Sequence, residues 1–368
     1  MNRLLSRRFR FLTFASIFLL AYVHGYNLNE TYLTPYSTVS ERLTFTTWFE
    51  YLVSNGLLRF RIPILFGISG YLYAMFDNAP YGQRTRRRFV NLILPYVLWS
   101  AFGLLLTFLL QQTPFTLKVL QTASLDQMGD NRPYTEVPWT DMLKRLFLAP
   151  VSYQLWFLRV LFIYNLLYPV IRWLVAKVPA IWFAITFFLW AVYFNLYFIE
   201  SQGLFFFSLG VWLFTSNRNI ENPPTWYSQG LAWIFFIGVC VIKTFMAFEL
   251  EPNTTSTFVL LSVLHKLAVL SGVLAVWFSA DPLVAWWMRH PLRKQISGYS
   301  FFIFGMHIPL LVYVMYAARL SGWFVFKSRL VNYLIIPLLV MSLCMAAAWA
   351  VQRYAPRLYK VLTGGRGL

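Results

Sequence analysis

Charged side chains are scarce in this sequence of 368 residues, since Asp, Glu, Lys and Arg together make up only 12% of it. An average soluble domain carries about 25% charged residues, so a water-soluble globular protein is excluded. The hydrophobic share of 59% also excludes a disordered chain. What remains is a polytopic membrane protein, and the mean hydropathy of +0.57 agrees with that class.

Cysteine and histidine are also rare. The two cysteines, Cys240 and Cys344, lie inside apolar runs, which excludes a disulfide framework. The four histidines are dispersed and the sequence has no HxxxH or CxxC pair, so no metal site is expected. A P-loop and a GxGxxG motif are missing as well, and nucleotide hydrolysis therefore has no support.

Ten apolar segments have about the length of a transmembrane helix, which needs roughly 20 apolar residues. None shows the alternating pattern of a membrane-barrel strand, so we predict an all-α polytopic membrane protein with about ten transmembrane helices. The predicted spans are 9–26, 56–76, 89–110, 153–174, 178–199, 203–216, 228–248, 258–279, 299–319 and 331–353. The basic N-terminus resembles a signal peptide, but no small-residue cleavage site follows it, so 9–26 is interpreted as the first helix.

The distribution of basic residues predicts the orientation of these spans. With both termini in the cytoplasm, most loop Lys and Arg residues lie inside and most loop carboxylates outside, as the positive-inside rule requires. We therefore expect one integral-membrane domain, 1–368, in the bacterial cytoplasmic (inner) membrane, with no appended soluble domain. The loops 27–55 and 111–152 are expected outside, with the amphipathic stretch Trp139–Leu148 lying along the outer membrane surface.

One inner loop carries a dense basic run made of Arg84, Arg86, Arg87 and Arg88. The run has two interpretations, which are a topology signal that anchors to lipid headgroups and a docking site for an anionic cytoplasmic ligand. A nucleic-acid partner is not expected, because the basic residues are spread over membrane-proximal loops rather than gathered on a soluble domain.

Several cations and histidines lie within or just inside the predicted spans, and no Asp or Glu clearly does. They are Arg59, Arg61, Arg159, Lys243, Lys266, Arg319, His24, His265 and His307. A charged residue in a span costs about 2.5–3.5 kcal/mol and is a functional candidate by default. Snorkelling to the interface is the alternative for Arg59, Lys243 and Arg319, and His265 is expected to satisfy a neighbouring polar group. Cations without internal carboxylates predict an anionic ligand.

Several short segments match one family in order and spacing. They are Tyr22–Gly25 at the end of the first span, Phe60–Leu72 with its Ser69-Gly70 pair, Leu94–Tyr96 after the basic run, Leu155–Leu158, and Tyr299–Ile303 continuing to Met306–Leu310. Together they resemble the integral-membrane acyltransferase-3 family, which includes bacterial O-antigen, capsule and nodulation-factor O-acyltransferases. The family has an Arg about eleven residues before the first-helix His, whereas position 13 here is Thr, and the nearest candidate is Arg10.

The resemblance implies transfer of an acyl group, acetyl in the simplest case, from acyl-CoA to a hydroxyl of an extracytoplasmic glycan. It implies His24 as general base, with Arg61 and Ser69 stabilising the oxyanion. The basic run would bind the phosphates of CoA, which is a co-substrate and not a permanent cofactor. The substrate-binding candidates are Arg59, Gly70, Trp156, Arg159 and His307.

Each of these roles has a structural alternative. His24 could make a hydrogen bond at a helix end, the Ser69-Gly70 pair could permit close helix packing, and Trp156 could belong to the interfacial aromatic belt. The rival function is a secondary transporter or flippase for an anionic substrate, which an inverted repeat would favour. No such repeat is visible. The expected partners are membrane lipid, acyl-CoA and a glycan or lipid-linked saccharide, and the oligomeric state is not readable.

Overall fold

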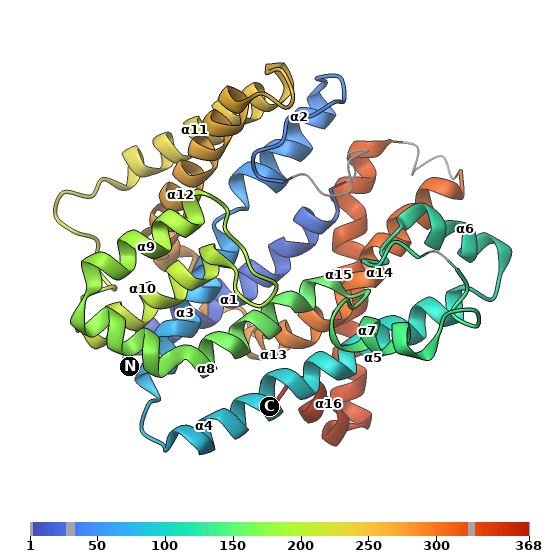
Figure 1. Cartoon of the computed structure of the whole chain (residues 1–368), viewed down its shortest axis with the longest axis horizontal. Coiled ribbons are helices and arrows are strands. Elements are labelled where there is room, and N and C mark those ends of the chain that lie inside the picture. Colours follow the sequence, from blue (N-terminus) through green and yellow to red (C-terminus); the bar gives the residue numbers. More distant parts are fainter. Residues whose placement is uncertain (1–2, 27–33, 131, 323–327, 368) are drawn as a thin grey trace. The chain divides into compact units, whose positions relative to one another are not determined.

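The computed structural model describes residues 3–26, 34–130, 132–322 and 328–367, and the regular secondary structure in these ranges is helical (Figure 1). Within them, seven helical stretches are long and apolar enough to cross a membrane. These stretches are Phe45–Met75, Tyr81–Leu110, Tyr153–Lys177, Gln229–Glu249, Thr255–Arg289, Ser300–Leu320 and Arg329–Tyr354. The predicted all-α membrane fold is confirmed.

The three other predicted spans each contain a helix, namely α1 (Arg3–His24), α9 (Pro179–Ala191) and α10 (Ser201–Thr215). The prediction of helix for 192–199 was wrong, because α9 ends at Ala191. Helices α9 and α10 have 13 and 15 residues, which is short for a full crossing. The number of ten spans and the side on which the termini lie therefore stay predictions.

The second span begins eleven residues earlier than the sequence suggested. Thr44 caps its first helix, because its side chain accepts from Thr47 N while the Thr47 side chain accepts from Thr44 N. The stretch then runs through α2 (Phe45–Tyr51), the π-helical turn η1 (Leu52–Leu57) and α3 (Arg61–Met75). The loop prediction for 45–55 was wrong because its polar residues face the protein interior.

Two carboxylates lie in helices that extend past the predicted spans. Glu50 belongs to α2 and is fully buried. Asp281 lies in α12 (Thr255–Arg289), which continues ten residues beyond its predicted end. The expectation that no Asp or Glu falls clearly within a span stays a prediction.

The chain divides into two compact units, and each combines separate stretches of sequence. Unit 1 consists of Met1–Ala79 and Ile163–Arg293, and unit 2 consists of Pro80–Phe162 and Lys294–Leu368. Unit 1 therefore contains α1 to α3, α9, α10, α11 (Gln229–Glu249) and α12, while α8 (Trp156–Lys177) passes from unit 2 into unit 1.

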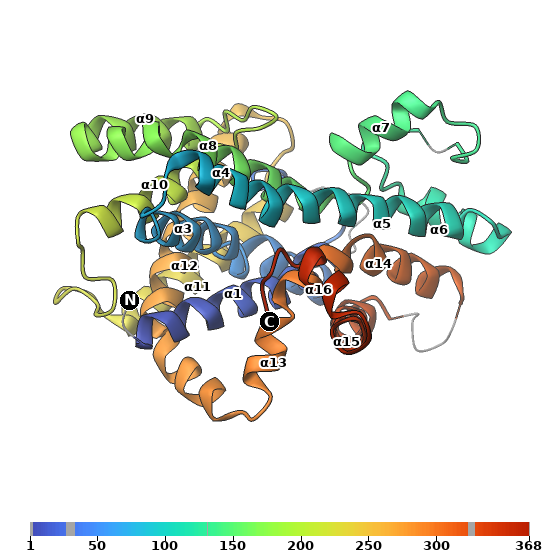
Figure 2. The same cartoon turned by 90° about the horizontal axis from the view of Figure 1, so that it is seen from below.

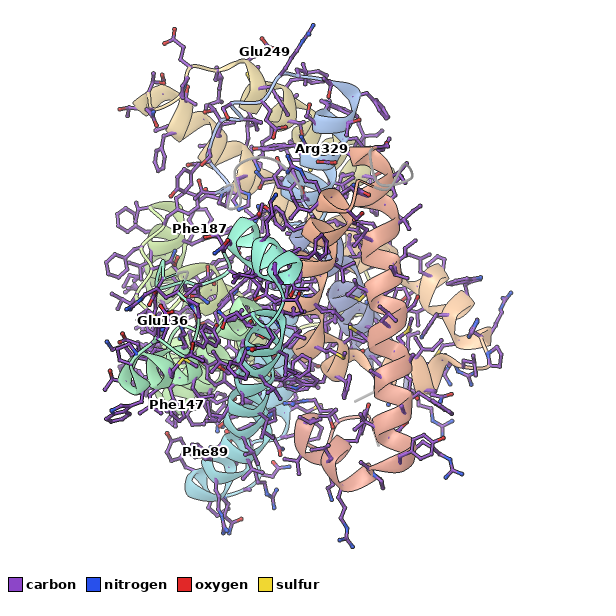
Figure 3. The ribbon with its side chains drawn as sticks, turned by 90° about the vertical axis from the view of Figure 1, so that its right-hand side faces the viewer. Phe89, Glu136, Phe147, Phe187, Glu249 and Arg329 are labelled. Atoms are coloured by element: carbon purple, nitrogen blue, oxygen red, sulfur yellow. The ribbon has the colours of Figure 1, made fainter. Side chains whose placement is uncertain are left out.

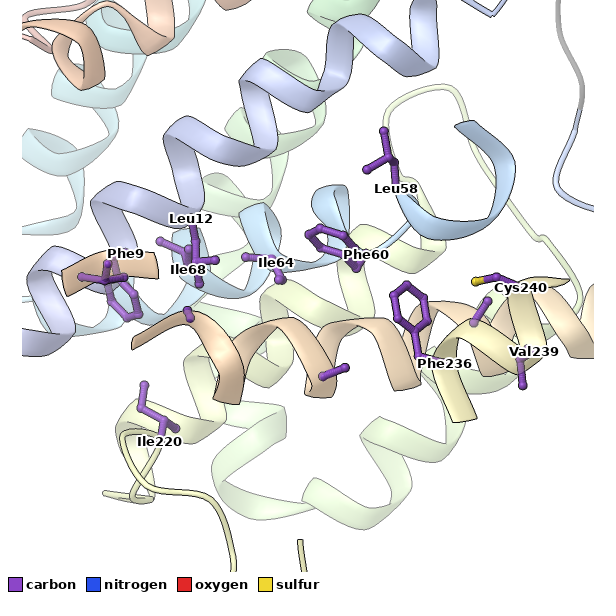
Figure 4. Packing of buried hydrophobic residues seen from close by; sticks show 14 of the residues in the cluster. Phe9, Leu12, Leu58, Phe60, Ile64, Ile68, Ile220, Phe236, Val239 and Cys240 are labelled. Carbon is purple, nitrogen blue, oxygen red and sulfur yellow. The ribbon is translucent and has the colours of Figure 1, made fainter. Parts of the chain in front are cut away.

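Unit 1 has an apolar core between α1, α3, α11 and α12. Phe9 and Leu12 of α1 belong to one buried cluster with Ile64 and Ile68 of α3 and Phe236 of α11 (Figure 4). Apolar residues three and four apart on α1 and α3 supply this face, as expected for helices that pack along one stripe. This core fixes α1, α3, α11 and α12 against one another.

An ion pair fixes the start of α1 to α12. The Arg8 guanidinium is 1% exposed and contacts both carboxylate oxygens of Asp281 at 2.7 and 2.8 Å. It also donates to the carbonyl oxygen of Ile220 and lies 5.7 Å from the Trp277 ring. Arg10, the sequence candidate for the family arginine, is exposed instead.

Unit 2 is built on one long helix and the C-terminal helices. Figure 2 shows α4 (Tyr81–Arg88) running through η2 (Phe89–Ile93) into α5 (Leu94–Leu110). The basic run thus forms the first turns of a helix and is not a loop. The remaining elements of the unit are α6 (Pro114–Ala123), α7 (Trp139–Phe147), η3 (Tyr153–Leu155), α13 (Arg293–Gly298, shared with unit 1), α14 (Ser300–Leu320), α15 (Arg329–Tyr354) and α16 (Pro356–Leu362).

The amphipathic stretch at 139–148 does form a helix, α7. Its Trp139 is 73% exposed, whereas Arg145 is fully buried and pairs with Asp126 at 2.6 Å and with Asp130 at 3.4 Å. The position of α7 on the outer membrane surface stays a prediction. The buried pair ties Asp126 and Asp130 to α7.

Many large apolar side chains face outward. Phe89, Phe147 and Phe187 are each at least 40% exposed, and Figure 3 shows them on the surface of their helices. A soluble monomer seldom exposes apolar patches larger than a few hundred Å². This surface agrees with helices that contact lipid.

Helices α3 and α10 approach so closely that only glycine fits between them. A Cβ atom on Gly210 would lie 2.0 Å from the carbonyl oxygen of Gly67, and one on Gly70 would lie 2.1 Å from that of Phe207. These contacts involve backbone, which cannot move aside as a flexible side chain can. Small residues allow this kind of packing in membrane helices.

We expect Gly210→Ala to lower the apparent Tm of the detergent-solubilised protein, because overpacking of this kind costs about 1–3 kcal/mol. The matched control is Gly238→Ala on α11, where an added Cβ meets no atom within 4 Å. Thermal unfolding followed by circular dichroism would measure both variants. Equal Tm values for the two variants would contradict the close packing of α3 on α10.

Candidate active site

Charged and polar side chains gather inside unit 1 from three separate parts of the chain. We call Arg59, Lys243, His265 and Lys266 the cationic cluster. Arg59 follows η1, Lys243 lies on α11, and His265 and Lys266 are neighbours on α12. Gly56 lets η1 approach α11, because a Cβ there would lie 3.2 Å from the Cβ of Cys240. The cluster is therefore a product of tertiary packing.

Lys243 is the most deeply buried member. Its side chain has no exposed surface, its Nζ donates to the carbonyl oxygen of Asn55 at 2.7 Å, and it lies 5.5 Å from the centre of the Tyr51 ring. The snorkelling alternative therefore fails for Lys243. Asn55 belongs to the π-helical turn η1, and such turns often occur at functional sites because they change the direction of carbonyls and side chains.

Lys266 is held by aromatic rings. Its Nζ lies 3.5 Å from the centre of the Tyr193 ring and 5.9 Å from that of Trp190, a geometry that stabilises a cation through the ring face. Among the described residues, the Lys266 Nζ and the Nδ1 of His265 have no hydrogen-bond partner. These two buried nitrogen atoms could therefore form hydrogen bonds with a ligand.

The charges of this cluster act on one another. Lys243, Arg59 and Lys266 all lie close enough to His265 for their positive charges to act on it. In the part of the chain that the structure describes, none of the four residues makes an ion pair with Asp or Glu. An uncompensated positive potential in a poorly hydrated interior attracts anions strongly.

The C-terminal end of α1 reaches this cluster. Helix α1 ends at His24, where the Gly25 N–H donates to the Ala21 carbonyl oxygen, and His24 itself is half-buried. Two residues later, the Tyr26 ring lies 6.4 Å from the Tyr51 ring, and Tyr26 also interacts electrostatically with Arg59. The structure therefore brings the segment that carries His24 to the side of the cationic cluster.

Arg61 contacts α1 nearer to the middle of that helix than His24 lies. Its guanidinium is 2% exposed and donates to the carbonyl oxygen of Leu58 at 2.5 Å and to that of Ser16 at 3.5 Å. Ser16 precedes His24 by eight residues, about 12 Å along a helix. Arg61 thus ties α3 to α1 below His24, and its catalytic role stays a prediction.

The Ser69-Gly70 pair lies further along α3. Gly70 packs against the backbone of Phe207, which is the helix-packing alternative that the sequence left open. Ser69 is half-buried on the same helix. Their predicted roles in oxyanion stabilisation and substrate binding are not tested by these contacts.

Trp156, Arg159 and His307 belong to unit 2. Trp156 begins α8 and is half-buried, and Arg159 donates through Nη1 to the carbonyl oxygen of Leu148 at 2.6 Å. His307 is fully buried on α14, with its Nδ1 3.0 Å from the carbonyl oxygen of Ile303. Substrate contacts for these three residues stay predictions.

Gln154 is a site candidate that sequence reasoning missed. Pro309 lacks an N–H, so it leaves the carbonyl oxygen of Gly305 without its usual helical donor, and the backbone at Ile308 is non-helical. Gln154 Nε2 lies 3.2 Å from the carbonyl oxygens of both Gly305 and Ile308. A proline two residues after His307 was the available signal, because it frees carbonyl oxygens that need a buried donor.

The basic run in unit 2 gains a further arginine from the C-terminus. Arg86 and Arg87 are exposed on α4, while Arg366 donates to the carbonyl oxygen of Asn91 at 2.9 Å. Burial lowers the pKa of Arg366 to about 10, and the charge of Arg88 contributes in the same direction. Arg366 stays charged at pH 7 and lies beneath the exposed arginines of α4, close enough to Arg88 for the two charges to interact.

Comparisons with known proteins agree with the motifs of the chain. The model of the acyltransferase-3 family, described as an acyltransferase domain, matches residues 15–353. The chain is 26% identical over 325 residues to the succinoglycan biosynthesis protein ExoH of Rhizobium meliloti (strain 1021), a match that covers 87% of this chain and 82% of that protein. No solved structure matches the chain significantly. The family model spans most of the sequence, and the chain belongs to the acyltransferase-3 family.

Proposed function

We propose that this protein transfers an acyl group from a cytoplasmic acyl-CoA to a hydroxyl group of an extracytoplasmic polysaccharide or lipid-linked saccharide. The membership in an acyltransferase family supports the reaction type. The printed name of the relative, a succinoglycan biosynthesis protein, supports a polysaccharide as acceptor. The observation that carries the proposal is the cationic cluster, which lies beside the helix end that carries His24.

In this proposal His24 acts as general base. A sugar hydroxyl is a weak nucleophile, and a base with a pKa near the working pH activates it best, which an imidazole provides without adjustment. The hydroxyl proton passes to His24 while its oxygen attacks the thioester carbonyl. This attack forms the new C–O bond of a tetrahedral intermediate. The C–S bond then breaks, and the CoA thiolate leaves and takes the proton from protonated His24.

The cations supply the electrostatic part of the mechanism. A tetrahedral intermediate carries a negative oxygen, and donors that are already oriented stabilise it most where water is excluded. Arg61 and Ser69 are the proposed donors on α3, and Arg59 with the rest of the cationic cluster is proposed to hold an anionic group of one substrate. Since the cluster members lack carboxylate partners among the described residues, no internal pair has to break on binding.

Acyl-CoA would bind through its phosphates at the basic surface of unit 2. Arg84, Arg86, Arg87 and Arg88 are proposed to contact the pyrophosphate and the 3′-phosphate, because guanidinium groups bind phosphate oxygens in pairs. Arg366 adds a fifth guanidinium next to Arg88. A transporter or flippase would also use buried cations, but membership in the acyltransferase-3 family favours the transferase.

We expect His24→Ala to abolish acylation of the surface polysaccharide, because general acid–base catalysis contributes about 10²–10⁴-fold. Mass analysis of the polysaccharide from cells that produce wild type, the variant or no protein would show an ester of defined mass in the first only. The matched control is His290→Ala at the end of α12, which should retain the ester. An intact ester in cells that produce His24→Ala would sink the role of His24 as base.

A second prediction concerns the donor site. Replacement of Arg84, Arg86, Arg87 and Arg88 by Gln should raise the Kd for CoA at least about tenfold, since each exposed charge pair contributes a fraction of a kcal/mol or more. Calorimetry on the solubilised protein would measure this affinity. Arg353→Gln with Arg357→Gln, two exposed arginines of the same unit, serve as the control. Unchanged CoA affinity in the quadruple variant would leave the run with a topological role alone.

A further inference from the structure

A second feature of unit 1 lies at the same end as His24. It is a cavity of about 500 Å³ between the segment 36–40, the end of α11 and the start of α12. Pockets that bind small molecules have volumes of about 300–1,000 Å³. The lining residues are Tyr36, Ser37, Thr38, Val39, Ser40, Phe248, Leu250, Pro252, Asn253, Thr254, Thr257 and Phe258.

The walls of this cavity are fixed by backbone contacts. The Val39 N–H donates to the carbonyl oxygen of Ala247 at 2.7 Å, which ties the segment 36–40 to α11. Thr254 caps α12 by accepting from Thr257 N at 3.2 Å. Since both sides are held by hydrogen bonds, the cavity is formed before any ligand binds, which lowers the entropic cost of binding.

The lining has a specific chemical character. It combines aromatic rings, such as Tyr36 and Phe258, with hydroxyl and amide groups, such as those of Thr38 and Asn253, and none of the described residues that line it carries a charged side chain. A pyranose ring presents apolar C–H faces and a rim of hydroxyl groups, so it matches both kinds of surface. A uronic acid or a phosphorylated sugar would bury its charge without a partner here, which is costly.

A chain of packed aromatic rings connects the wall of the cavity with the cationic cluster. The Tyr36 ring lies 4.8 Å from Phe258 and 4.6 Å from Tyr193, and the Tyr193 ring in turn holds Lys266. Tyr36, Val39 and Phe248 also pack in one apolar cluster with Tyr51, the ring beside Lys243. A ligand in the cavity would thus contact Tyr36 and Phe258, and Tyr36 in turn contacts the ring that holds Lys266.

We infer that this cavity is the acceptor subsite and that it binds an uncharged sugar residue of the saccharide. The inference rests on the proposed function for its place in the reaction, but binding of sugar in the cavity can be measured without turnover. The uncharged cavity and the cationic cluster then divide the work. The cavity positions a neutral sugar ring, and the cluster is left for an anionic group of a substrate other than this ring.

Calorimetry on the full-length protein in detergent micelles tests this inference, with a neutral glucose tetrasaccharide and a tetrasaccharide of a uronic acid as the two probes. We expect the neutral probe to bind more tightly than the uronic acid. Phe258→Ala should weaken the binding of the neutral probe about tenfold, because one aromatic wall is removed. Phe235→Ala, an exposed aromatic residue of α11 outside the cavity, should leave the affinity unchanged.

The introduction of a positive charge gives a second, independent readout. Thr38→Arg adds a cation to the lining and should shift the preference toward the uronic acid. The inference is overturned if neither probe binds, if the uronic acid binds wild type more tightly, or if Phe258→Ala binds the neutral probe as wild type does. If a variant binds the neutral probe normally but no longer forms the polysaccharide ester, the variant has lost the catalytic step and not the sugar site. An absence of acylation by wild type would overturn the proposed function and leave the sugar affinity measurable.

Discussion

The burial of positive charge without an internal counter-ion is the constraint on which the account of this protein depends. Elsewhere the same fold pairs its buried arginines. Arg8 contacts Asp281 and Arg145 contacts Asp126, each at less than 3 Å. Lys243 and Lys266 have no such partner among the described residues, although each is at most 7% exposed. We propose that these two lysines serve substrate binding and not stability.

The surrounding packing explains how such a cluster persists. Carbonyl and ring faces replace carboxylates, since Lys243 donates to Asn55 and Lys266 lies over Tyr193. The rigid contact of α3 with α10 through glycines, and the apolar core shared by α1, α3 and α11, hold the elements in place. Since carbonyls and rings are weaker partners than a carboxylate, an anionic group of a substrate can still gain free energy by approaching the cluster.

The sequence predicted the helical membrane fold and the family well, because both depend on local features such as long apolar runs and short motifs. It failed where long-range packing decides. The polar residues of 45–55 were interpreted as a loop, although burial makes Glu50 part of a helix. It likewise missed Gln154 and Tyr193, since no local pattern shows that one side chain faces a kinked helix or that the other supports Lys266. The cations themselves were found, because a charge inside an apolar run is visible without a structure.

The most direct measurement of the central claim combines stability and turnover in Lys266→Met. If Lys266 is retained to bind substrate, removal of its buried charge should raise the apparent Tm, while acyl transfer falls at least about tenfold. Lys177→Met, at the exposed end of α8, should change neither quantity. A lower Tm with unchanged acyl transfer in Lys266→Met would contradict the account, because the cation would then have a structural role.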